Sequence, residues 1–415
     1  MLWERTSTLL TGGTALPTSM KMPDDPNLLP KAGGEEFEAL LDREGLAVRS
    51  KGSVKFFVNG TAFYPEFMRV VREARQRIDV QAYIFDNDQF AVEVADLLKR
   101  KSRDVPVRVY FDSLGTLLAA KEDPPIPPPA GFKPPGNLKS HLTDDSLIKV
   151  RKSGNPYFVA DHTKLHVIDD KIAFVGGMNV GVEYRFTWHD LMARIEGPIV
   201  HQLGGVYRDH WQGEEWQRHW GLRGWFEKEP PPPPATAVAG RQVPLRMLLT
   251  DTPLGKREVL KAALAGIRCA RQRVWIQTPY FSTDEISAEL QKAVQRGVDV
   301  RVIVPGSNDS KLMEKATVAE LKKLIETGAK VYEYPGMTHL KATICDDWGM
   351  FGSANYDTLS MRINRELNLA TSDPDTVREL AQKVFEPDFR VSSRLSLEKA
   401  KARGGVFAEV IGDQL

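Results

Sequence analysis

The sequence HTKLHVIDDKIAFVGGMN, residues 162–179, recurs in related form as HLKATICDDWGMFGSAN, residues 339–355. Both copies begin with the pattern His-x-Lys-x4-Asp and run through a glycine to an asparagine, and a carboxylate stands eleven residues after each asparagine. Such internal repetition indicates a duplicated architecture, with half of one site in each copy. The matching residues are His162, Lys164, Asp169, Asn179 and Asp190 in the first copy, and His339, Lys341, Asp346, Asn355 and Glu366 in the second.

The first copy has the pattern of a β-hairpin. Two short apolar runs, 165–169 and 172–175, flank the polar pair at 170–171. Residues two apart on a strand face the same side, so His162 and Lys164 are expected to point at one ligand. Asn179 is expected to return to the same point after the second strand.

The residue types at this point suit a phosphate. Gly176 and Gly177 are expected to let the backbone approach a bulky anion closely. A histidine, a lysine and an amide around one point form a phosphate-binding set. Two such sets suit a phosphodiester that is being cleaved or exchanged.

Two histidines are needed because the two steps of such a reaction need opposite groups. A neutral imidazole attacks phosphorus, while an imidazolium protonates the departing alcohol and later activates water or an acceptor alcohol. Lys164 and Lys341 are expected to stabilise charge on the non-bridging oxygens. Asp190 and Glu366 are expected to hold each imidazole in one tautomer through its second nitrogen.

Asp169 and Asp346 stand an odd number of residues after their histidines. On a regular strand they therefore face away from the ligand. We expect them to orient the turn and to have a structural role.

The composition is that of an ordinary globular protein, with 42% apolar and 27% charged residues. The net charge of +1 provides no global attraction to nucleic acid, so no nucleic-acid partner is expected. Cys269 and Cys345 lie in apolar segments and are predicted to be buried and unpaired. No apolar run has the length of a signal peptide or of a membrane span, which predicts a cytoplasmic or peripheral membrane protein.

Self-similarity extends beyond the two motifs. The segment 74–81 reappears as 270–277, and each copy is followed by aromatic residues. A helical stretch comes next (90–101 or 286–296), and then a run typical of a β-strand. This order predicts two α/β halves with mixed, mainly parallel central strands.

Proline-rich segments divide the chain. The five prolines at 230–234 favour an extended linker, and the cluster at 123–136 is expected to be a surface excursion or an insertion in the first half. The expected divisions are an N-terminal extension (1–47), a first domain (48–228), a linker (229–240) and a second domain (241–415).

In these residues, the chain resembles the phospholipase D superfamily, whose members share a doubled His-Lys-Asp motif. Within it, the chain is similar to bacterial cardiolipin synthases and related phosphatidyltransferases, from about residue 51 to about residue 389. The stretches that carry the resemblance are QAYIF (81–85), GGMN (176–179), WHD (188–190), RIEGP (194–198), TPYF (278–281) and GSAN (352–355).

The resemblance implies two α-β-α sandwich halves whose motifs meet at the interface, a covalent phosphohistidine, no cofactor and no metal. It further implies that His162 is the nucleophile and His339 the general acid and base. The expected substrate is a phospholipid at a membrane surface, with water or an alcohol as acceptor. No motif distinguishes hydrolysis from transfer.

Two rival functions remain open from the sequence. The same chemistry fits a phosphodiesterase or endonuclease acting on nucleic acid, although the low net charge argues against it. A binding module without turnover is the other rival, and the intact residues in both motifs argue against it.

Other conspicuous residues have plainer interpretations. His162 and His166 are four apart, but on a strand they are about 13 Å from each other, so His166 is expected to be structural rather than a metal ligand. His189 is expected to pack beside the site. The tryptophans at 188–225 are expected to pack on the sheet, with a membrane-facing role as the alternative, and 390–403 to form a solvated terminal helix.

Overall fold

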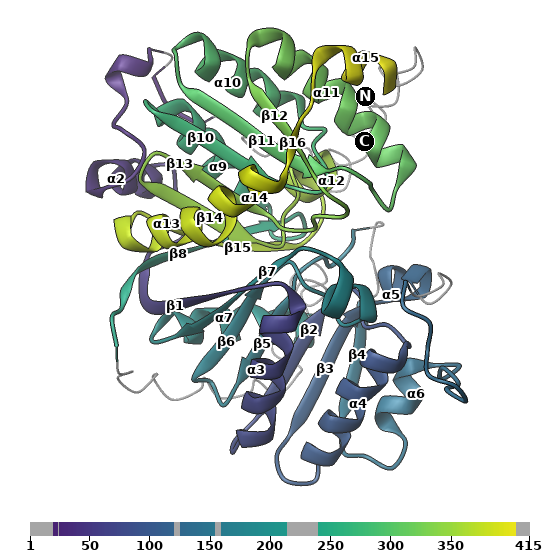
Figure 1. The fold of residues 1–415 in the computed structure, drawn as a ribbon. Helices are drawn as coiled ribbons and strands as arrows, with labels where there is room; N and C mark the ends of the chain where they lie inside the picture. Colours follow the sequence, from purple (N-terminus) through teal and green to yellow (C-terminus); the bar gives the residue numbers. More distant parts are fainter. Residues whose placement is uncertain (1–19, 24, 120–124, 154–158, 214–239, 404–415) are drawn as a thin grey trace.

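The structure is a computed structural model, and it describes residues 20–23, 25–119, 125–153, 159–213 and 240–403. Figure 1 shows two α/β halves, one above the other. The first half contains β1 (Ser50–Val58), α3 (Gly60–Glu73), β2 (Ile78–Ala82), α4 (Gln89–Lys101), β3 (Val107–Asp112), α5 (Ser113–Ala119), α6 (Leu138–Thr143), β4 (Lys149–Ser153), β5 (Leu165–Ile168), β6 (Ile172–Gly176), the π-helical turn η3 (Glu183–Thr187), β7 (Leu191–Glu196) and α7 (Ile199–Gln212).

The second half repeats much of this order. Two further elements, η1 (Pro26–Leu28) and α2 (Glu35–Arg43), come before β1 and so precede both halves in the chain. The elements of the second half are β8 (Val243–Asp251), β9 (Lys256–Arg257), α9 (Glu258–Cys269), β10 (Arg273–Gln277), α10 (Asp284–Gln295), β11 (Asp299–Pro305), α11 (Lys311–Thr327), β12 (Lys330–Tyr334), β13 (Ala342–Cys345), β14 (Trp348–Gly352), α12 (Thr358–Arg362), β15 (Glu366–Thr371), α13 (Pro374–Leu380), the π-helical turn η4 (Ala381–Phe385), α14 (Glu386–Val391), β16 (Ser393–Arg394) and α15 (Leu397–Arg403).

The strands of both halves join into one sheet. Its order is β16-β12-β11-β10-β13-β14-β15-β8-β1-β7-β6-β5-β2-β3-β4, with β9 paired to β8. The halves meet where β1 pairs with β8, with Ser50 opposite Leu245 and Gly52 opposite Val243. The two motif hairpins, β5–β6 and β13–β14, therefore occupy equivalent positions on either side of this junction.

The α/β class with two similar halves is confirmed, but the expectation of mainly parallel strands is wrong. Among the described strands, the parallel pairs are β2–β3, β3–β4, β10–β11 and β11–β12, and the other pairs are antiparallel. The parallel pairs β2–β3 and β10–β11 are joined by the helical crossovers α4 and α10, as parallel strands require. The motif hairpins have turns of two or three residues, and turns this short join only antiparallel strands.

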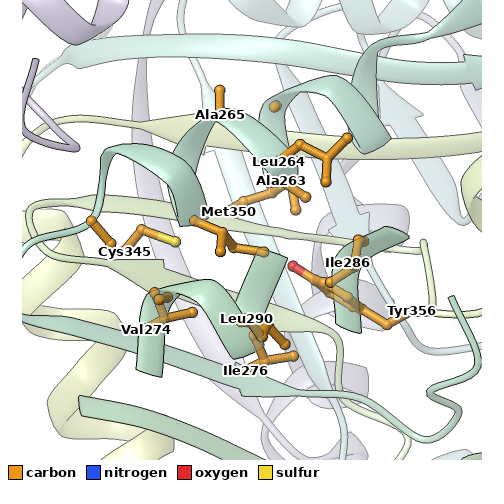
Figure 2. Packing of buried hydrophobic residues seen from close by; sticks show 14 of the residues in the cluster. Ala263, Leu264, Ala265, Val274, Ile276, Ile286, Leu290, Cys345, Met350 and Tyr356 are labelled. Atoms are coloured by element: carbon orange, nitrogen blue, oxygen red, sulfur yellow. The ribbon is translucent and has the colours of Figure 1, made fainter. Parts of the chain in front are cut away.

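Apolar side chains at helical and strand spacing explain where these elements pack. On α10, Ile286, Leu290 and Ala293 are buried, and Figure 2 shows Leu290 beside Ile276 of β10 and Ile286 beside Tyr356. Three buried clusters result. One lies on the outer face of each half, and a third, lined by α7 and η4, contains residues from both halves, such as Leu165 and Leu340. This shared core fixes the position of one motif relative to the other.

The described part of the N-terminal extension packs against the second half. Phe37 and Leu41 of α2 are fully buried in the cluster of α9 and α10. The buried guanidinium of Arg246 on β8 donates to the carboxylate of Glu38 over 2.6 Å. The extension therefore adds a helix to the second half, although it precedes the first half in the sequence.

The two proline-rich segments differ in how far the structure describes them. Residues 125–136 form a largely exposed segment without helix or strand, and the side-chain amide of Asn87 donates to the carbonyl of Pro135 over 3.2 Å. The predicted linker lies outside the described residues except for Gly240. Across the described ranges, none of the helices combines the length and the apolar character needed to cross a bilayer.

Candidate active site

The motif histidines stand just before the first strand of each hairpin, and each is followed by its lysine. The Nζ atom of Lys164 donates to the carbonyl of His162 over 2.8 Å, and Lys341 makes the same contact to His339. All four side chains are buried, with 8% of His162 and 5% of His339 exposed. Each histidine and its lysine therefore belong to one local unit, and their joint contact with a ligand stays a prediction.

The two units are joined crosswise. Nδ1 of His162 lies 2.8 Å from Oε1 of Glu366, and Nδ1 of His339 lies 2.7 Å from Oδ2 of Asp190. Each imidazole is thus held by a carboxylate from the opposite half. Because Nδ1 is engaged in both cases, Nε2 is the nitrogen that remains for chemistry.

Backbone hydrogen bonds reinforce this crossing. The amide of His162 donates to the carbonyl of Arg365, the residue before Glu366, over 3.0 Å. The amide of His339 donates over 2.7 Å to the carbonyl of His189, the residue before Asp190. The two halves therefore meet through the same contact made twice, with the histidine of one half against the carboxylate segment of the other.

The two carboxylates have different surroundings. Glu366 accepts hydrogen bonds from the hydroxyl groups of Ser353 over 2.5 Å and Ser360 over 2.7 Å. Asp190 accepts from the backbone amide of Leu191 over 2.7 Å. The position of Ser353 corresponds to Gly177 in the first copy, so the hydroxyl exists only on the Glu366 side.

The expected role of Gly176 and Gly177 is wrong. A Cβ atom at Gly177 would lie 2.2 Å from Oδ1 of Asp190, and one at Gly176 would lie 2.2 Å from the carbonyl oxygen of Leu191. The space that these glycines leave is filled by the protein's own carboxylate strand rather than by a ligand. They are needed because β6 and β7 pack so closely there.

Burial and the clustered cations shift the ionisation of the site. Burial, together with Lys164 and Lys341, lowers the pKa of His162 well below its usual range, and burial with Lys341, Lys164 and His162 lowers the pKa of His339. Burial also lowers the pKa of Lys341 to about 8 and that of Lys164 well below its usual range. Since each lysine acts on both histidines, the two motifs form one electrostatic site.

The carboxylates shift in the opposite direction. Burial raises the pKa of Glu366 to about 8 and that of Asp190 to about 6, against the opposing effect of Lys164 and Lys341. The raised carboxyl pKa and the lowered imidazole pKa have the same consequence. Each imidazole and its carboxylate hold protons between them, so little charge is buried.

The asparagines lie in the site region, but Asn179 is committed to the protein. Its Oδ1 atom accepts from the amide of Ile84 over 3.0 Å, which ties the segment after β2 to the motif. Asn355 is buried, and its Oδ1 atom has no hydrogen-bond partner within the described residues. A phosphate contact by either asparagine stays a prediction.

Asp169 and Asp346 have the structural position expected of them. The carboxylate of Asp169 accepts from three successive backbone amides, those of residues 75–77, over 2.6–3.1 Å. Asp346 accepts from the amides of residues 271–273 over 2.8–2.9 Å. Each aspartate therefore fixes the loop that leads into β2 or β10, away from the imidazoles.

The sequence assigns no aromatic side chain a role at the site, and Trp188 was expected to pack on the sheet. The ring of Tyr83 lies 4.8 Å from the ring of His162. Tyr184 and Trp188 lie 5.5 and 5.3 Å from His339. Tyr83 and Trp188 stand in stretches that carry the family resemblance, which is the signal that could have marked them.

A buried polar network behind His162 was also missed. Asp161 lies 3.2 Å from His210 and 3.5 Å from Arg365, and Arg365 in turn lies 3.9 Å from Asp251. Asp161 and His210 belong to the first half, whereas Arg365 and Asp251 belong to the second. These residues are far apart in the sequence and share no motif, so no local pattern marks them.

The plainer interpretations of several residues are confirmed. His166 is buried between Phe63 and Phe67, and His189 stacks on Tyr334 at 4.5 Å. Cys269 and Cys345 are buried and free. Trp211 packs with Tyr207 on α7, whereas Trp216, Trp220 and Trp225 lie outside the described residues.

The terminal helix is not simply solvated. Residues 397–403 form α15, which packs on α11 and buries Ala400. Lys399 and Arg403 both pair with Glu333.

Within the described residues, one acidic group has the spacing of a metal site, with oxygens of Asp86, Asp88 and Glu183 within 4.8 Å of one another. Asp88 already caps α4 by accepting from the amide of Ala91 over 2.7 Å, and it also accepts from the amide of Val182. The carboxylate of Asp88 is therefore engaged in backbone contacts, and the expected absence of a metal stays a prediction.

Two α/β halves that place two buried histidines between crossed carboxylates and paired lysines define an enzyme class, that of two-histidine phosphodiester-transferring enzymes. The family model described as "Cardiolipin synthase, PLD-like domain" matches residues 67–211 and 264–388, one segment in each half. The chain belongs to this phospholipase D-like family.

Curated relatives and solved structures agree with this placement. The chain is 30% identical to a probable cardiolipin synthase of Bacillus subtilis, YwiE, over 84% of this chain and 68% of that protein. It is 28% identical to cardiolipin synthase A of Pseudomonas syringae, over 85% and 71%. The crystal structure of a phosphatidylserine synthase from Haemophilus influenzae shares the fold, with a TM-score of 0.64, 14% identity, and coverage of 91% and 95%.

Proposed function

We propose that this chain is a phosphatidyltransferase of the cardiolipin synthase type, which moves a phosphatidyl group from a phospholipid to an acceptor alcohol through a covalent phosphohistidine. The observation that carries the proposal is the pair of crossed contacts, His162 with Glu366 and His339 with Asp190. Each contact leaves one imidazole Nε2 to act on a common phosphorus.

In the first step, Nε2 of His162 attacks phosphorus and the bond to the head-group oxygen breaks. His339, protonated on Nε2, gives its proton to that oxygen, so the alcohol leaves neutral. The lowered pKa of His162 keeps its imidazole neutral and nucleophilic. The negative phosphodiester offsets the two lysines, which favours the imidazolium form of His339.

In the second step, the neutral His339 takes the proton of an acceptor hydroxyl, and the acceptor oxygen attacks phosphorus. The bond between phosphorus and Nε2 breaks, and His162 returns to its starting form. Lys164 and Lys341 stabilise the charge on the non-bridging oxygens during both steps. Burial lowers the pKa of both lysines, and an anionic ligand opposes this effect by favouring their ammonium forms.

Two observations favour an alcohol over water as the acceptor. The curated relatives cited above bear the name cardiolipin synthase. Both histidines are also nearly inaccessible, with 8% and 5% of their surface exposed, which restricts free entry of water. With phosphatidylglycerol as both donor and acceptor, the products are cardiolipin and glycerol. Such substrates are held in a bilayer, so the protein acts as a peripheral membrane enzyme.

The test is mass spectrometry of vesicles of phosphatidylglycerol, phosphatidylethanolamine and phosphatidylcholine after incubation with the chain in EDTA. We expect cardiolipin to form, and the variant His162→Ala to form none. Phosphatidic acid as the main product would replace transfer by hydrolysis. Unchanged lipids, together with cleavage of DNA or RNA by the same preparation, would overturn the phospholipid assignment.

A further inference from the structure

Four large apolar side chains with exposed surface belong to elements whose neighbouring residues contact the histidine site. They are 39–55% exposed, whereas most large apolar residues of the described chain are buried. We name them the rim residues: Leu117 on α5, Phe186 on η3, Leu312 on α11 and Leu359 on α12.

The two rim residues of the first half are close in the chain to groups that contact the site. Leu117 follows Thr116, whose hydroxyl accepts from the amide of Phe85, and α5 packs on the ring of Tyr83 beside His162. Phe186 stands between Tyr184 and Trp188, the two rings that flank His339.

The two rim residues of the second half have the same relation to the site. Leu359 precedes Ser360, whose hydroxyl donates to Glu366. Leu312 stands three residues after Asp309, which accepts from the hydroxyl of Tyr280 over 2.6 Å and whose charge acts on Lys341. Figure 1 shows α5 below and α12 above the boundary between the halves, where the site lies.

Cations accompany this apolar rim. Lys311 and Lys315, exposed on the first turns of α11, flank Leu312. The guanidinium of Arg185 lies 4.8 Å from the ring of Phe186. Exposed apolar side chains interleaved with cations suit an anionic bilayer surface, where apolar groups enter the acyl boundary and cations meet lipid phosphates.

We propose that the rim residues insert into an anionic lipid bilayer and press the entrance of the site onto it. The inference rests on the proposed function, because a phospholipid must bring its phosphate to nearly inaccessible histidines while its acyl chains stay out of water. Contact between the entrance and the bilayer satisfies both conditions, because the head group then enters the site while the acyl chains stay in the bilayer.

The matched control is Leu147, which is 70% exposed but lies at the other end of the first half. Its amide donates to the hydroxyl of Ser102, the residue after α4, whereas the site-proximal Asp88 caps the start of that helix. A serine at Leu147 therefore removes a similar exposed apolar side chain without touching the rim.

The experiment compares the wild type, the fourfold variant L117S/F186S/L312S/L359S and Leu147→Ser. Binding is measured by co-sedimentation with vesicles of equal parts phosphatidylglycerol and phosphatidylcholine. Turnover is measured on those vesicles and on dihexanoyl phosphatidylglycerol dissolved as monomers. We expect the fourfold variant to lose at least about tenfold in vesicle binding and vesicle turnover, yet to keep monomer turnover within about twofold. Leu147→Ser should match the wild type.

The possible failures are distinct. Equal vesicle binding by the wild type and the fourfold variant would overturn the rim as a membrane surface, as would a wild type that turns over monomers but binds no vesicles. A dimer that the fourfold variant converts to a monomer, with vesicle binding unchanged, would assign the rim to a second copy of the chain. Rim-dependent vesicle binding without conversion of lipid in either form would leave the surface standing and overturn the proposed function.

Discussion

Nδ1 of His162 lies 2.8 Å from Oε1 of Glu366, a residue 204 positions later in the chain and in the other half of the molecule. The reciprocal pair, His339 with Asp190, is separated by 149 positions. Neither half therefore contains both a motif histidine and the carboxylate that holds it. The repeat supplies two equal sets of residues, and the docking of the halves exchanges their carboxylates.

Replacing the carboxylates tests this exchange. Glu366→Gln replaces the carboxylate beside Nδ1 of His162 by a neutral amide that can also donate to Nδ1 and favour the other tautomer, so kcat should fall about 10²- to 10⁴-fold. Ser360→Ala removes one hydrogen bond to Glu366 and should have a smaller effect. Turnover in phosphatidylglycerol vesicles measures both variants, with circular dichroism as the folding control. A Glu366→Gln enzyme within about threefold of the wild type would contradict the assigned role.

A substrate with a good leaving group separates the two histidines. Phosphatidyl-p-nitrophenol needs no acid to release its alcohol, so His339→Ala should still form a covalent phosphatidyl-enzyme and then stall. His162→Ala should form no adduct. Intact-mass spectrometry after a short incubation measures the adduct. The reverse pattern would make His339 the nucleophile.

The pKa of Lys341, lowered to about 8, predicts a falling limb in the pH profile. As pH rises through this pKa the ammonium loses its charge, so kcat/KM should decline above about pH 8. Lys341→Arg keeps the cation at all these pH values and should lose this limb, even if its plateau is lower. Lys311→Arg, outside the catalytic site, is the control and should keep the wild-type profile. An unchanged limb in Lys341→Arg would assign the limb to another group.

Asp251 should make the fold less stable at higher pH. Burial raises its pKa from 3.8 to about 7, so the folded state holds a proton that the unfolded state has already lost. The contribution of Asp251 to the free energy of unfolding is complete below about pH 4 and is lost as pH rises to about 7, a change of roughly 4 kcal/mol. Asp251→Asn removes this dependence and can still accept the hydrogen bond from Leu254. Urea unfolding at pH 5 and pH 8 measures the free energy of unfolding of both proteins. Relative to the wild type, Asp251→Asn should be more stable at pH 8 than at pH 5. An equal difference at both pH values would contradict this origin.

Asp169→Ala and Asp346→Ala should act on stability. Each substitution leaves up to three backbone amides without their acceptor, which costs about 1–3 kcal/mol in the free energy of unfolding. Asp347→Ala, next to Asp346 and half-exposed, is the control and should change stability by less than about 1 kcal/mol. Denaturant unfolding measures the change. Loss of activity without loss of stability would give the motif aspartates a chemical role instead.

Local features of the fold were readable from the sequence. The hairpin of residues 165–175, the helix near 90–101 and the outward position of Asp169 each follow from periodicity within a few residues. The proportion of parallel strands was not readable, because it depends on how the hairpins pair with the crossover strands. The true role of Gly177 was hidden for the same reason, since the atom that fills its space belongs to Asp190 on the returning segment.

The sequence by itself determined which chemical groups the site contains: two histidines, two lysines and two carboxylates at matched offsets. Only the tertiary structure decided that Glu366 serves His162 and Asp190 serves His339, and that aromatic rings and the Asp161 network surround them. The physical reason is that side-chain periodicity orients a residue within its own strand. The segment of the other half that this residue faces is set by the shared core and by the pairing of β1 with β8.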